Sequence, residues 1–254
     1  MKLLACDIGN NFVKIGLFNK NKLTKFFSER TENLTMSFLT DVKFDAVAIS
    51  SVVPHATKFL ENFFKKNFNI TPFVINSNAK FNLQLDYETP ETLGTDRICG
   101  AEGAFEIYCE KFQSNALKKN ESIITIDLGT ATTINVILPP NIFSGGVILP
   151  GVVMMSNLLN KNTEQLPNVS LKSYNSVIGK STPSAIASGI VNSTIGAAAR
   201  INDFLKREKG VKKIYIFLTG GNSAYFKKVI SFEVYFVKDL VLRGIKSVYE
   251  RNLK

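Results

Sequence analysis

Asp7-Ile8-Gly9-Asn10-Asn11 and Asp127-Leu128-Gly129-Thr130-Ala131 are two matching turns in one chain of 254 residues. Each follows an apolar stretch typical of a buried strand, and each leads directly into a second strand. One Asp-x-Gly turn indicates little, because such turns are common in hairpins. Two copies, each opening a block of three predicted strands, indicate a duplicated α/β domain with a cleft between its halves.

The hydrophobic pattern around these turns predicts the remaining elements. In the first half we expect strands at 2–7, 12–19, 23–29, 45–51 and 72–75, and helices at 34–40, 58–68 and 93–112. In the second half we expect strands at 122–127, 131–138, 142–149 and 214–218, a long helix from 182, and a closing helix at 239–251. The polar stretch 113–120 separates the halves, which predicts domains at 1–116 and 117–254.

Composition limits the class of protein. The chain is 45% hydrophobic and 20% charged, and a chain of this size can bury about three quarters of its unfolded surface. No apolar run approaches the roughly 18 residues of a membrane span. Its three cysteines are an odd number in a long chain, which favours reduced thiols. We therefore expect a cytoplasmic protein with no membrane partner.

The net charge of +10 comes from lysines scattered along the chain, none of them in a block of five or six. They fit solvated faces, or a general attraction for anionic small molecules such as nucleotides. No helix-turn-helix and no aromatic-basic RNA motif is recognisable, so nucleic acid is not a favoured partner.

Several mechanisms are excluded by missing residue types. The chain has one histidine, His55, so no HExxH metal site can form. It has no CxxC pair, no phosphate-binding G-x-x-x-x-G-K-[ST] loop and no G-x-G-x-x-G fingerprint.

The Asp-x-Gly turns themselves suit phosphate chemistry. A glycine directly after a strand lets backbone N–H groups approach a phosphate, and the aspartate can hold Mg²⁺. Thr130 adds a hydroxyl donor to the second turn. A plain hairpin, with the aspartate capping local amides, is the alternative. The later stretch 219–223, Thr-Gly-Gly-Asn-Ser, could bind phosphate or sugar at a helix start, or be a tight turn only.

Leu93-Gly94-Thr95-Asp96-Arg97 is the sharpest local signal. Arg97 could bind a carboxylate or phosphate through two parallel hydrogen bonds. Asp96 could accept the proton of an attacking hydroxyl; it is a weak base, but phosphoryl transfer depends mainly on orientation and charge stabilisation. Alternatively, Asp96 serves only the helix N-terminus and Arg97 is solvated.

Taken in order, these motifs resemble the type III pantothenate kinases, a family of the acetate and sugar kinase/Hsp70/actin superfamily. The resemblance spans essentially the whole chain and includes Gly145-Gly146, Pro150-Gly151 and Gly220-Gly221. It implies duplicated ribonuclease H-like (actin-like ATPase) domains with an interdomain cleft. It also implies ATP-dependent phosphorylation of pantothenate to 4'-phosphopantothenate, the first step of coenzyme A biosynthesis.

The resemblance further implies roles for individual residues. The ATP-binding residues would be Asp7, Ile8, Gly9, Asn10, Asn11, Phe12, Val13, Lys14 and Thr130, with Asp7 helping to place Mg²⁺. The pantothenate-binding residues would be Tyr87, Gly94, Thr95, Asp96, Arg97 and Thr182, with Asp96 the proton acceptor. Asp127 would bind a monovalent cation, K⁺ or NH₄⁺. Thr182 is equally suited to be the N-cap before Pro183. A homodimer with pantothenate near the subunit interface is also implied.

One position departs from the family pattern: Asn11 stands where threonine is usual after Asp-x-Gly-Asn. An amide can still donate a hydrogen bond, but the phosphate contact there differs. Two other functions stay open, a kinase of the same superfamily for a sugar or carboxylate, and a regulatory protein acting in transcription. A binding-only descendant should have lost a phosphate turn or the proton acceptor, yet Asp7, Asp96 and Asp127 are all present. The short length and Gly94-x-Asp96-Arg97 argue against another kinase substrate.

Overall fold

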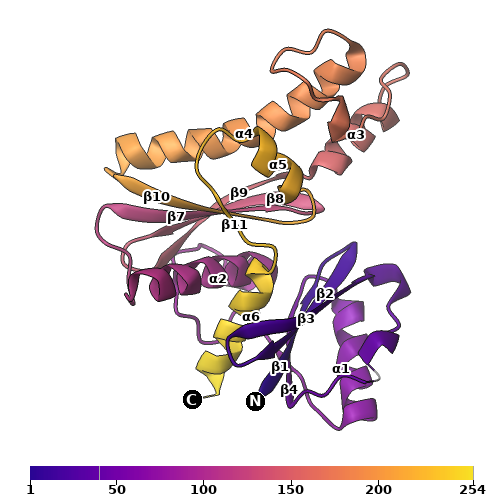
Figure 1. Ribbon diagram of the computed structural model, residues 1–254, viewed down its shortest axis with the longest axis vertical. Coiled ribbons are helices and arrows are strands. Elements are labelled where there is room, and N and C mark those ends of the chain that lie inside the picture. Colours follow the sequence, from indigo (N-terminus) through magenta and orange to yellow (C-terminus); the bar gives the residue numbers. More distant parts are fainter. Residues whose placement is uncertain (40, 254) are drawn as a thin grey trace. The chain divides into compact units, whose positions relative to one another are not determined.

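The computed structural model describes residues 1–39 and 41–253, which fall into two compact units (Figure 1). Unit 1 comprises Met1–Ala116, Asn141–Ser144 and Asp239–Lys254, and unit 2 comprises Leu117–Pro140 and Gly145–Lys238. The units therefore differ from two continuous halves of the chain. The closing helix groups with the N-terminal part because it packs along a helix of that part.

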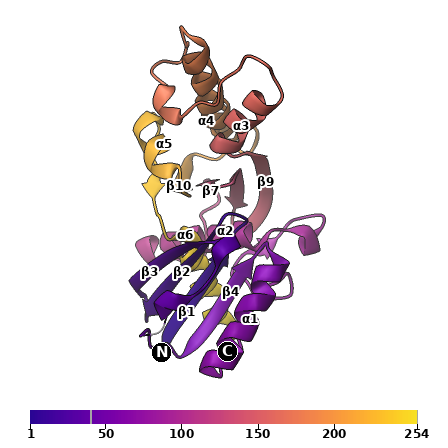
Figure 2. The same cartoon turned by 90° about the vertical axis from the view of Figure 1, so that its right-hand side faces the viewer.

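Unit 1 contains a five-stranded sheet with the order β3-β2-β1-β4-β5. Its strands are β1 (Lys2–Ile8), β2 (Phe12–Asn19), β3 (Lys22–Arg30), β4 (Ala46–Ser51) and β5 (Phe73–Val74). The first two form an antiparallel hairpin, and β4 lies parallel to β1 on its other side. Helix α1 (Pro54–Phe68) runs along this sheet, as Figure 2 shows.

Alternation along β1 determines which side chain faces which layer. Leu4, Cys6 and Ile8 lie in the core that α1 covers. Leu3 and Ala5 lie in a second core with side chains of α2 (Thr95–Phe112) and α6 (Leu240–Asn252). Because successive side chains of a strand point to opposite faces, Asp7 continues the second set and emerges on the side of α2 and α6.

Helices α2 and α6 approach each other closely through glycines. A Cβ added to Gly103 would overlap the carbonyl oxygen of Leu240, and one added to Gly244 would overlap that of Cys99. Cys99 is fully buried in this contact layer. The backbones meet at this contact because neither glycine has a side chain to hold them apart.

The second sheet has the order β11-β10-β7-β8-β9-β6. Its strands are β6 (Gln84–Leu85), β7 (Glu121–Leu128), β8 (Ala131–Leu138), β9 (Ile142–Pro150), β10 (Lys213–Thr219) and β11 (Tyr235–Phe236). As in the first sheet, a hairpin (β7 and β8) adjoins a parallel neighbour, here β10. The edge strand β6 pairs with Ile142 and Phe143, which unit 1 includes.

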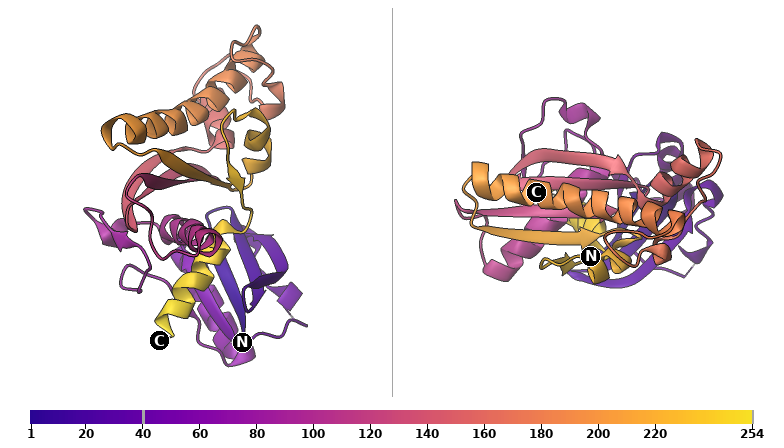
Figure 3. Two further views of the ribbon diagram at one scale, coloured as in Figure 1. Left: turned by 60° about the vertical axis from the view of Figure 1, so that its left-hand side comes forward. Right: turned by 90° about the horizontal axis from the view of Figure 1, so that it is seen from above.

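Unit 2 adds helices α3 (Val152–Lys161), α4 (Thr182–Glu208) and α5 (Ser223–Val229). Figure 3 shows α4 lying along the strands of the sheet, where Ile190 and Val191 share a core with Ile124 and Ile126. Among the residues that the structure describes, no helix has the length and apolar character of a membrane span.

Most predicted elements are present within two residues of their expected ends, and β2 and β8 coincide with the prediction. Helix α1 begins at Pro54, earlier than predicted. The helix predicted at 34–40 is wrong: the chain forms only a 3₁₀ turn at Ser37–Leu39, and residue 40 lies outside the described residues. Helix α3 was not predicted, because four consecutive apolar residues at its start hide any helical period.

Candidate active site

The hairpin between β1 and β2 presents a carboxylate and an ammonium group side by side. Asp7 ends β1, is 6% exposed and pairs in register with Lys14 of β2. The Lys14 Nζ lies 4.0 Å from the Asp7 Oδ2. The following turn is held by Thr31, whose hydroxyl donates to the Gly9 carbonyl oxygen (2.7 Å) and whose N–H donates to that of Asn11 (3.1 Å). Asn10 and Asn11 are exposed at its tip.

The start of α2 is fixed to the end of β4. The Thr95 hydroxyl accepts hydrogen bonds from the Ser50 hydroxyl (2.9 Å) and the Ser51 N–H (3.0 Å). Gly94 precedes the helix, and a Cβ there would lie 2.5 Å from the Asp96 Oδ1. Gly94 therefore leaves the space that the Asp96 carboxylate occupies.

Asp96 lies half-buried in the first turn of α2, with a perturbed acidity. Burial raises its pKa above the ordinary value of 3.8, while the Arg97 N–H (2.8 Å from Oδ1) and the charges of Arg97 and Lys14 lower it in part. The net shift is upward, so Asp96 is a stronger base than a solvated aspartate. The influence of Lys14 also shows that the start of α2 lies near the β1–β2 hairpin.

Arg97 is buried rather than solvated, at 7% exposure. Its Nη1 donates to the Tyr87 hydroxyl (3.2 Å), and its Cζ lies 5.7 Å from the Tyr87 ring centre and 5.9 Å from that of Phe143. The two rings are 6.2 Å apart. The guanidinium is thus oriented by two aromatic side chains, which suits recognition of a planar carboxylate.

Unit 2 builds its own turn at the end of β7. Asp127 pairs in register with Thr219, the last residue of β10. Gly220 follows with φ +95°, and a Cβ there would lie 2.5 Å from the Asp127 Oδ1. The Asn222 N–H and side-chain amide both donate to the Leu128 carbonyl oxygen (3.1 and 3.3 Å). The Gly-Gly stretch after β10 therefore packs directly against Asp127.

A third glycine motif joins the same turn. The Gly151 N–H donates to the Thr130 carbonyl oxygen (3.0 Å), and a Cβ on Gly151 would lie 2.6 Å from the carbonyl oxygen of Gly129. Pro150-Gly151, Gly220-Gly221 and the Asp-x-Gly turn, distant in sequence, thus meet at one place.

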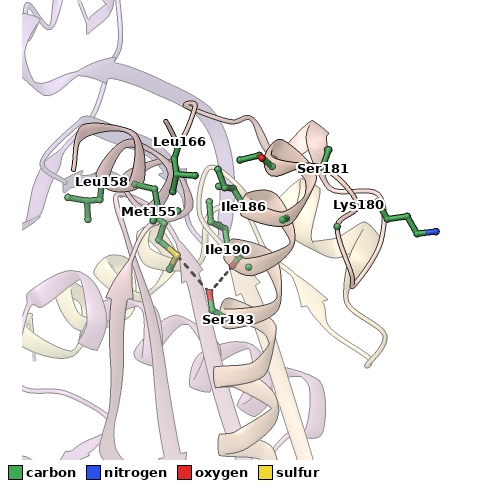
Figure 4. A pocket seen from close by; sticks show the side chains of 13 residues that line it. Met155, Leu158, Leu166, Lys180, Ser181, Ile186, Ile190 and Ser193 are labelled. Carbon is green, nitrogen blue, oxygen red and sulfur yellow. Dashed lines mark hydrogen bonds between the residues drawn. The ribbon is translucent and has the colours of Figure 1, made fainter. Parts of the chain in front are cut away.

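Thr182 begins α4 but does not cap it. Ser181 is the N-cap, in a reciprocal capping box with Ser184, and Thr182 itself is exposed. Thr182 borders an open, mostly apolar pocket of about 900 Å³ between α3 and α4. Figure 4 shows Met155, Leu166 and Ile186 around this pocket, with Lys180 directed away from it.

Comparison with known proteins identifies the family. The family model described as type III pantothenate kinase matches residues 3–203. The chain is 32% identical to a type III pantothenate kinase of Legionella pneumophila, with 96% of each chain covered. It is 31% identical to type III pantothenate kinase 1 of Francisella tularensis, covering 98% of this chain and 99% of that one. The chain belongs to the type III pantothenate kinase family.

Solved structures place this kinase family member in the actin-like fold, as the sequence predicted. A Campylobacter jejuni protein assigned to the Baf family of transcriptional activators superposes with a TM-score of 0.61 at 23% identity, covering 98% of both chains. A ROK family glucokinase from Streptomyces griseus gives a TM-score of 0.51 at 13% identity, covering 96% of this chain and 98% of that one. At these identities the likeness concerns the fold alone.

The predicted site residues of this kinase fall into three places. Unit 1 brings together Asp7, Lys14, Asp96 and Arg97, and Tyr87 is hydrogen-bonded to Arg97. Unit 2 holds Asp127 and Thr130 in one turn, and Thr182 lies at the start of α4. Sequence reasoning missed Thr31, which fixes the hairpin turn, and Phe143, which lies over Arg97. Neither has a local signal, because each acts only through a partner distant in sequence.

Proposed function

We propose that this protein transfers the terminal phosphoryl group of ATP to the hydroxyl of pantothenate, giving 4'-phosphopantothenate in the first step of coenzyme A biosynthesis. The observation that carries this proposal is Asp96, a carboxylate of raised pKa that accepts the N–H of the buried Arg97 and feels the charge of Lys14, the partner of Asp7. Membership of the type III pantothenate kinase family supplies the substrate.

In the mechanism, Asp96 orients the substrate hydroxyl and accepts its proton while the oxygen attacks the γ-phosphorus in line. Charge develops on the transferring phosphoryl oxygens and on the leaving oxygen of ADP. Lys14 and backbone N–H groups of the hairpin turn after Asp7 would stabilise that charge. Since these groups are held by strands before the substrate arrives, little reorganisation is needed during the reaction.

Pantothenate recognition is assigned to the start of α2 and its neighbours. Its carboxylate would pair with the Arg97 guanidinium, which Tyr87 orients. Gly94 and Thr95 would contribute backbone groups, because the Thr95 hydroxyl is already bonded to β4. Thr182 would add a hydroxyl, which its exposure beside the capping Ser181 leaves accessible.

ATP binding is assigned to the β1–β2 hairpin, Asp7 to Lys14, and to Thr130. The exposed Asn11 side chain would donate an amide hydrogen where a threonine hydroxyl is usual in the family. The ladder between Asp7–Ile8 and Val13–Lys14 holds the hairpin in place, so this exchange alters one contact and leaves the loop intact.

Asp7 fits a magnesium ion that ATP brings with it. No group of three His, Cys, Asp or Glu side chains that could hold a metal occurs within residues 1–39 and 41–253. Mg²⁺ in kinases is commonly held by one or two carboxylates together with phosphate oxygens and water, so a single buried carboxylate is suitable. When bound, the ion would offset phosphate charge. Asp7 would hold the ion, and Lys14 would offset further charge on the phosphates.

Asp127 fits the monovalent cation, K⁺ or NH₄⁺. Its carboxylate is approached by the backbone of Gly220, where a Cβ would fill the space beside Oδ1. Carboxylate and backbone carbonyl oxygens are hard ligands that such cations accept. When bound, the cation would add positive charge next to the Thr130 turn.

A homodimer working in the cytoplasm completes the proposal. Six apolar residues of unit 2 are exposed on α3 and the loop before α4, and we call them the α3–loop patch: Val153, Met154, Leu158, Leu159, Val177 and Ile178. Exposed apolar clusters mark interaction sites, and a second copy of this chain is the proposed occupant. The three cysteines form no disulfide, which suits a reducing compartment.

The test is an ATP-consumption assay with pantothenate and Mg²⁺, run in potassium and again in sodium. We expect pantothenate-dependent turnover that requires potassium or ammonium. Turnover in both salts would keep the kinase and remove the cation role of Asp127. Absence of turnover with pantothenate, but turnover with a sugar or another hydroxy acid, would replace the substrate. Absence of turnover with all of them would favour a non-catalytic role.

A further inference from the structure

Glu102 is a carboxylate that the proposed reaction does not use, and its side chain is fully buried. It lies in α2, between Arg97 and the end of the helix. Charged side chains are almost never buried completely unless they are paired or bonded. Burial raises its pKa, and hydrogen bonds from Leu83 and Asn82 counteract part of that shift.

Both oxygens of Glu102 bind the segment that leads to Tyr87. Oε1 accepts a hydrogen bond from the Leu83 N–H (2.7 Å), and Oε2 accepts one from the Asn82 side-chain amide (3.0 Å). Leu83 is itself buried, so its N–H has no water to replace this partner. The same Asn82 amide also reaches the Ser247 hydroxyl (3.1 Å) of α6.

From this anchor the chain reaches Tyr87 through residues 84–86, which backbone hydrogen bonds hold against residues 141–143. Beyond Leu83, the Gln84 N–H donates to the Asn141 carbonyl oxygen (2.9 Å), and the Asp86 N–H donates to that of Phe143 (3.0 Å). Tyr87 comes next and bonds Arg97, while the Phe143 ring lies over the same guanidinium. The path from Glu102 to Arg97 therefore lies entirely in unit 1.

We infer that Glu102 is a positioning residue: by fixing Asn82 and Leu83 it sets where Tyr87 meets Arg97, and so controls affinity for the substrate carboxylate. It touches no reacting atom, so its effect falls on binding and leaves phosphoryl transfer itself unchanged. The substrate name rests on the proposed function, whereas the anchoring of residues 82–87 does not depend on it.

The kinetic test compares Glu102→Ala and Glu102→Gln with the matched control Glu106→Ala. Glu106 is one turn further along α2, and its carboxylate pairs with Lys246 of α6 (3.4 Å). For Glu102→Ala we expect KM for pantothenate to rise about tenfold or more, with kcat and KM for ATP within about twofold. Glu102→Gln keeps an oxygen for the Leu83 N–H and should recover part of the affinity. Glu106→Ala should leave KM for pantothenate unchanged.

Amide hydrogen exchange gives a second readout that needs no substrate. In Glu102→Ala the amides of Leu83 and Asp86 should exchange about tenfold faster, and in Glu106→Ala they should not. Unchanged pantothenate KM in a folded Glu102→Ala, or an equal rise in Glu106→Ala, would overturn the inference. Should Glu102→Ala not fold, Glu102→Gln decides by the same two measurements. If the wild-type protein does not phosphorylate pantothenate, the proposed function fails, and the exchange rates alone decide the anchoring.

Discussion

Asp96 illustrates how one residue can combine two opposed environments. Burial favours its neutral form, while the Arg97 N–H and the charge of Lys14 favour its ionised form. A base of this kind accepts a proton more readily than a solvated aspartate does. Gly94 makes this arrangement possible, since any side chain there would meet the carboxylate.

Replacement of Asp96 should impair turnover and leave ATP binding intact. Asp96→Asn should lower kcat by about 10²–10⁴, because a positioned proton acceptor contributes that much. ATP affinity, measured by equilibrium titration, should stay within about twofold. The control is Glu91→Gln, the same chemical change at an exposed carboxylate just before α2, which should leave turnover intact. Near-wild-type turnover in Asp96→Asn would remove its assigned role.

The pH dependence follows from the same shift. The raised pKa of Asp96 means that the base becomes protonated at a higher pH than an ordinary aspartate as the solution is acidified. The acid limb of kcat/KM for pantothenate should therefore lie above pH 3.8, the ordinary value, and be absent from the residual activity of Asp96→Asn. A limb at or below that pH would contradict this assignment. The same shift makes stability change with pH in the direction opposite to activity. Because the folded state holds the proton of Asp96 more tightly than the unfolded state does, ionisation of Asp96 lowers the free energy of unfolding as the pH rises.

Substitutions of Arg97 and Tyr87 should distinguish the charged contact that binds the substrate carboxylate from the hydrogen bond that supports it. Arg97→Lys removes the two-pronged geometry and should raise KM for pantothenate by about 10- to 100-fold. Tyr87→Phe removes only a neutral hydrogen bond and should raise it by about 2- to 10-fold. Arg200→Lys, on the exposed face of α4, is the control and should change nothing. An effect of Tyr87→Phe larger than that of Arg97→Lys would reverse the proposed roles.

At the scale of elements, the contact between α2 and α6 depends on glycines that the helical pattern does not reveal. Periodicity predicted both helices, because their apolar residues recur every three or four positions. It could not predict that Gly103 and Gly244 meet, since that contact joins segments far apart in the chain. Likewise α3 was not predicted, because the four apolar residues at its start show no helical period; the exposure of Val153 and Leu158 is visible only in the structure.

Alanine substitutions at two helical glycines should change the free energy of unfolding in opposite directions. Gly244→Ala places a methyl group against the Cys99 carbonyl and should lower the free energy of unfolding by about 1–3 kcal/mol. Gly196→Ala, in α4, has nothing within 4 Å of the added methyl and should raise it by about 0.5–1 kcal/mol through helix propensity. Urea unfolding of both variants measures the difference. Equal effects of the same sign would show that propensity alone governs these positions.

At the scale of the molecule, the sequence predicted the duplication better than the site. Two Asp-x-Gly turns in matching strand blocks were readable because each is local. The grouping of α6 with the N-terminal part was not, since its partner α2 is distant in the chain. Nor could spacing show that Gly151 and Gly220 meet at one turn, or that Phe143 covers Arg97. These contacts exist only once the strands have been ordered in the second sheet.

The homodimer is the prediction that belongs to this scale. The α3–loop patch exposes Leu158 and Ile178, at 46% and 76%, beside the pocket that Thr182 borders. Leu158→Glu combined with Ile178→Glu should shift the protein from dimer to monomer in sedimentation velocity, because two charges per subunit cannot be buried without partners. Phe59→Glu, an exposed apolar residue of α1, is the control and should stay dimeric. Since pantothenate binding near the subunit interface is implied, the monomer should also show a raised KM for pantothenate with ATP affinity unchanged. A monomeric wild type, or a dimer that both substitutions leave intact, would show that this patch has another occupant.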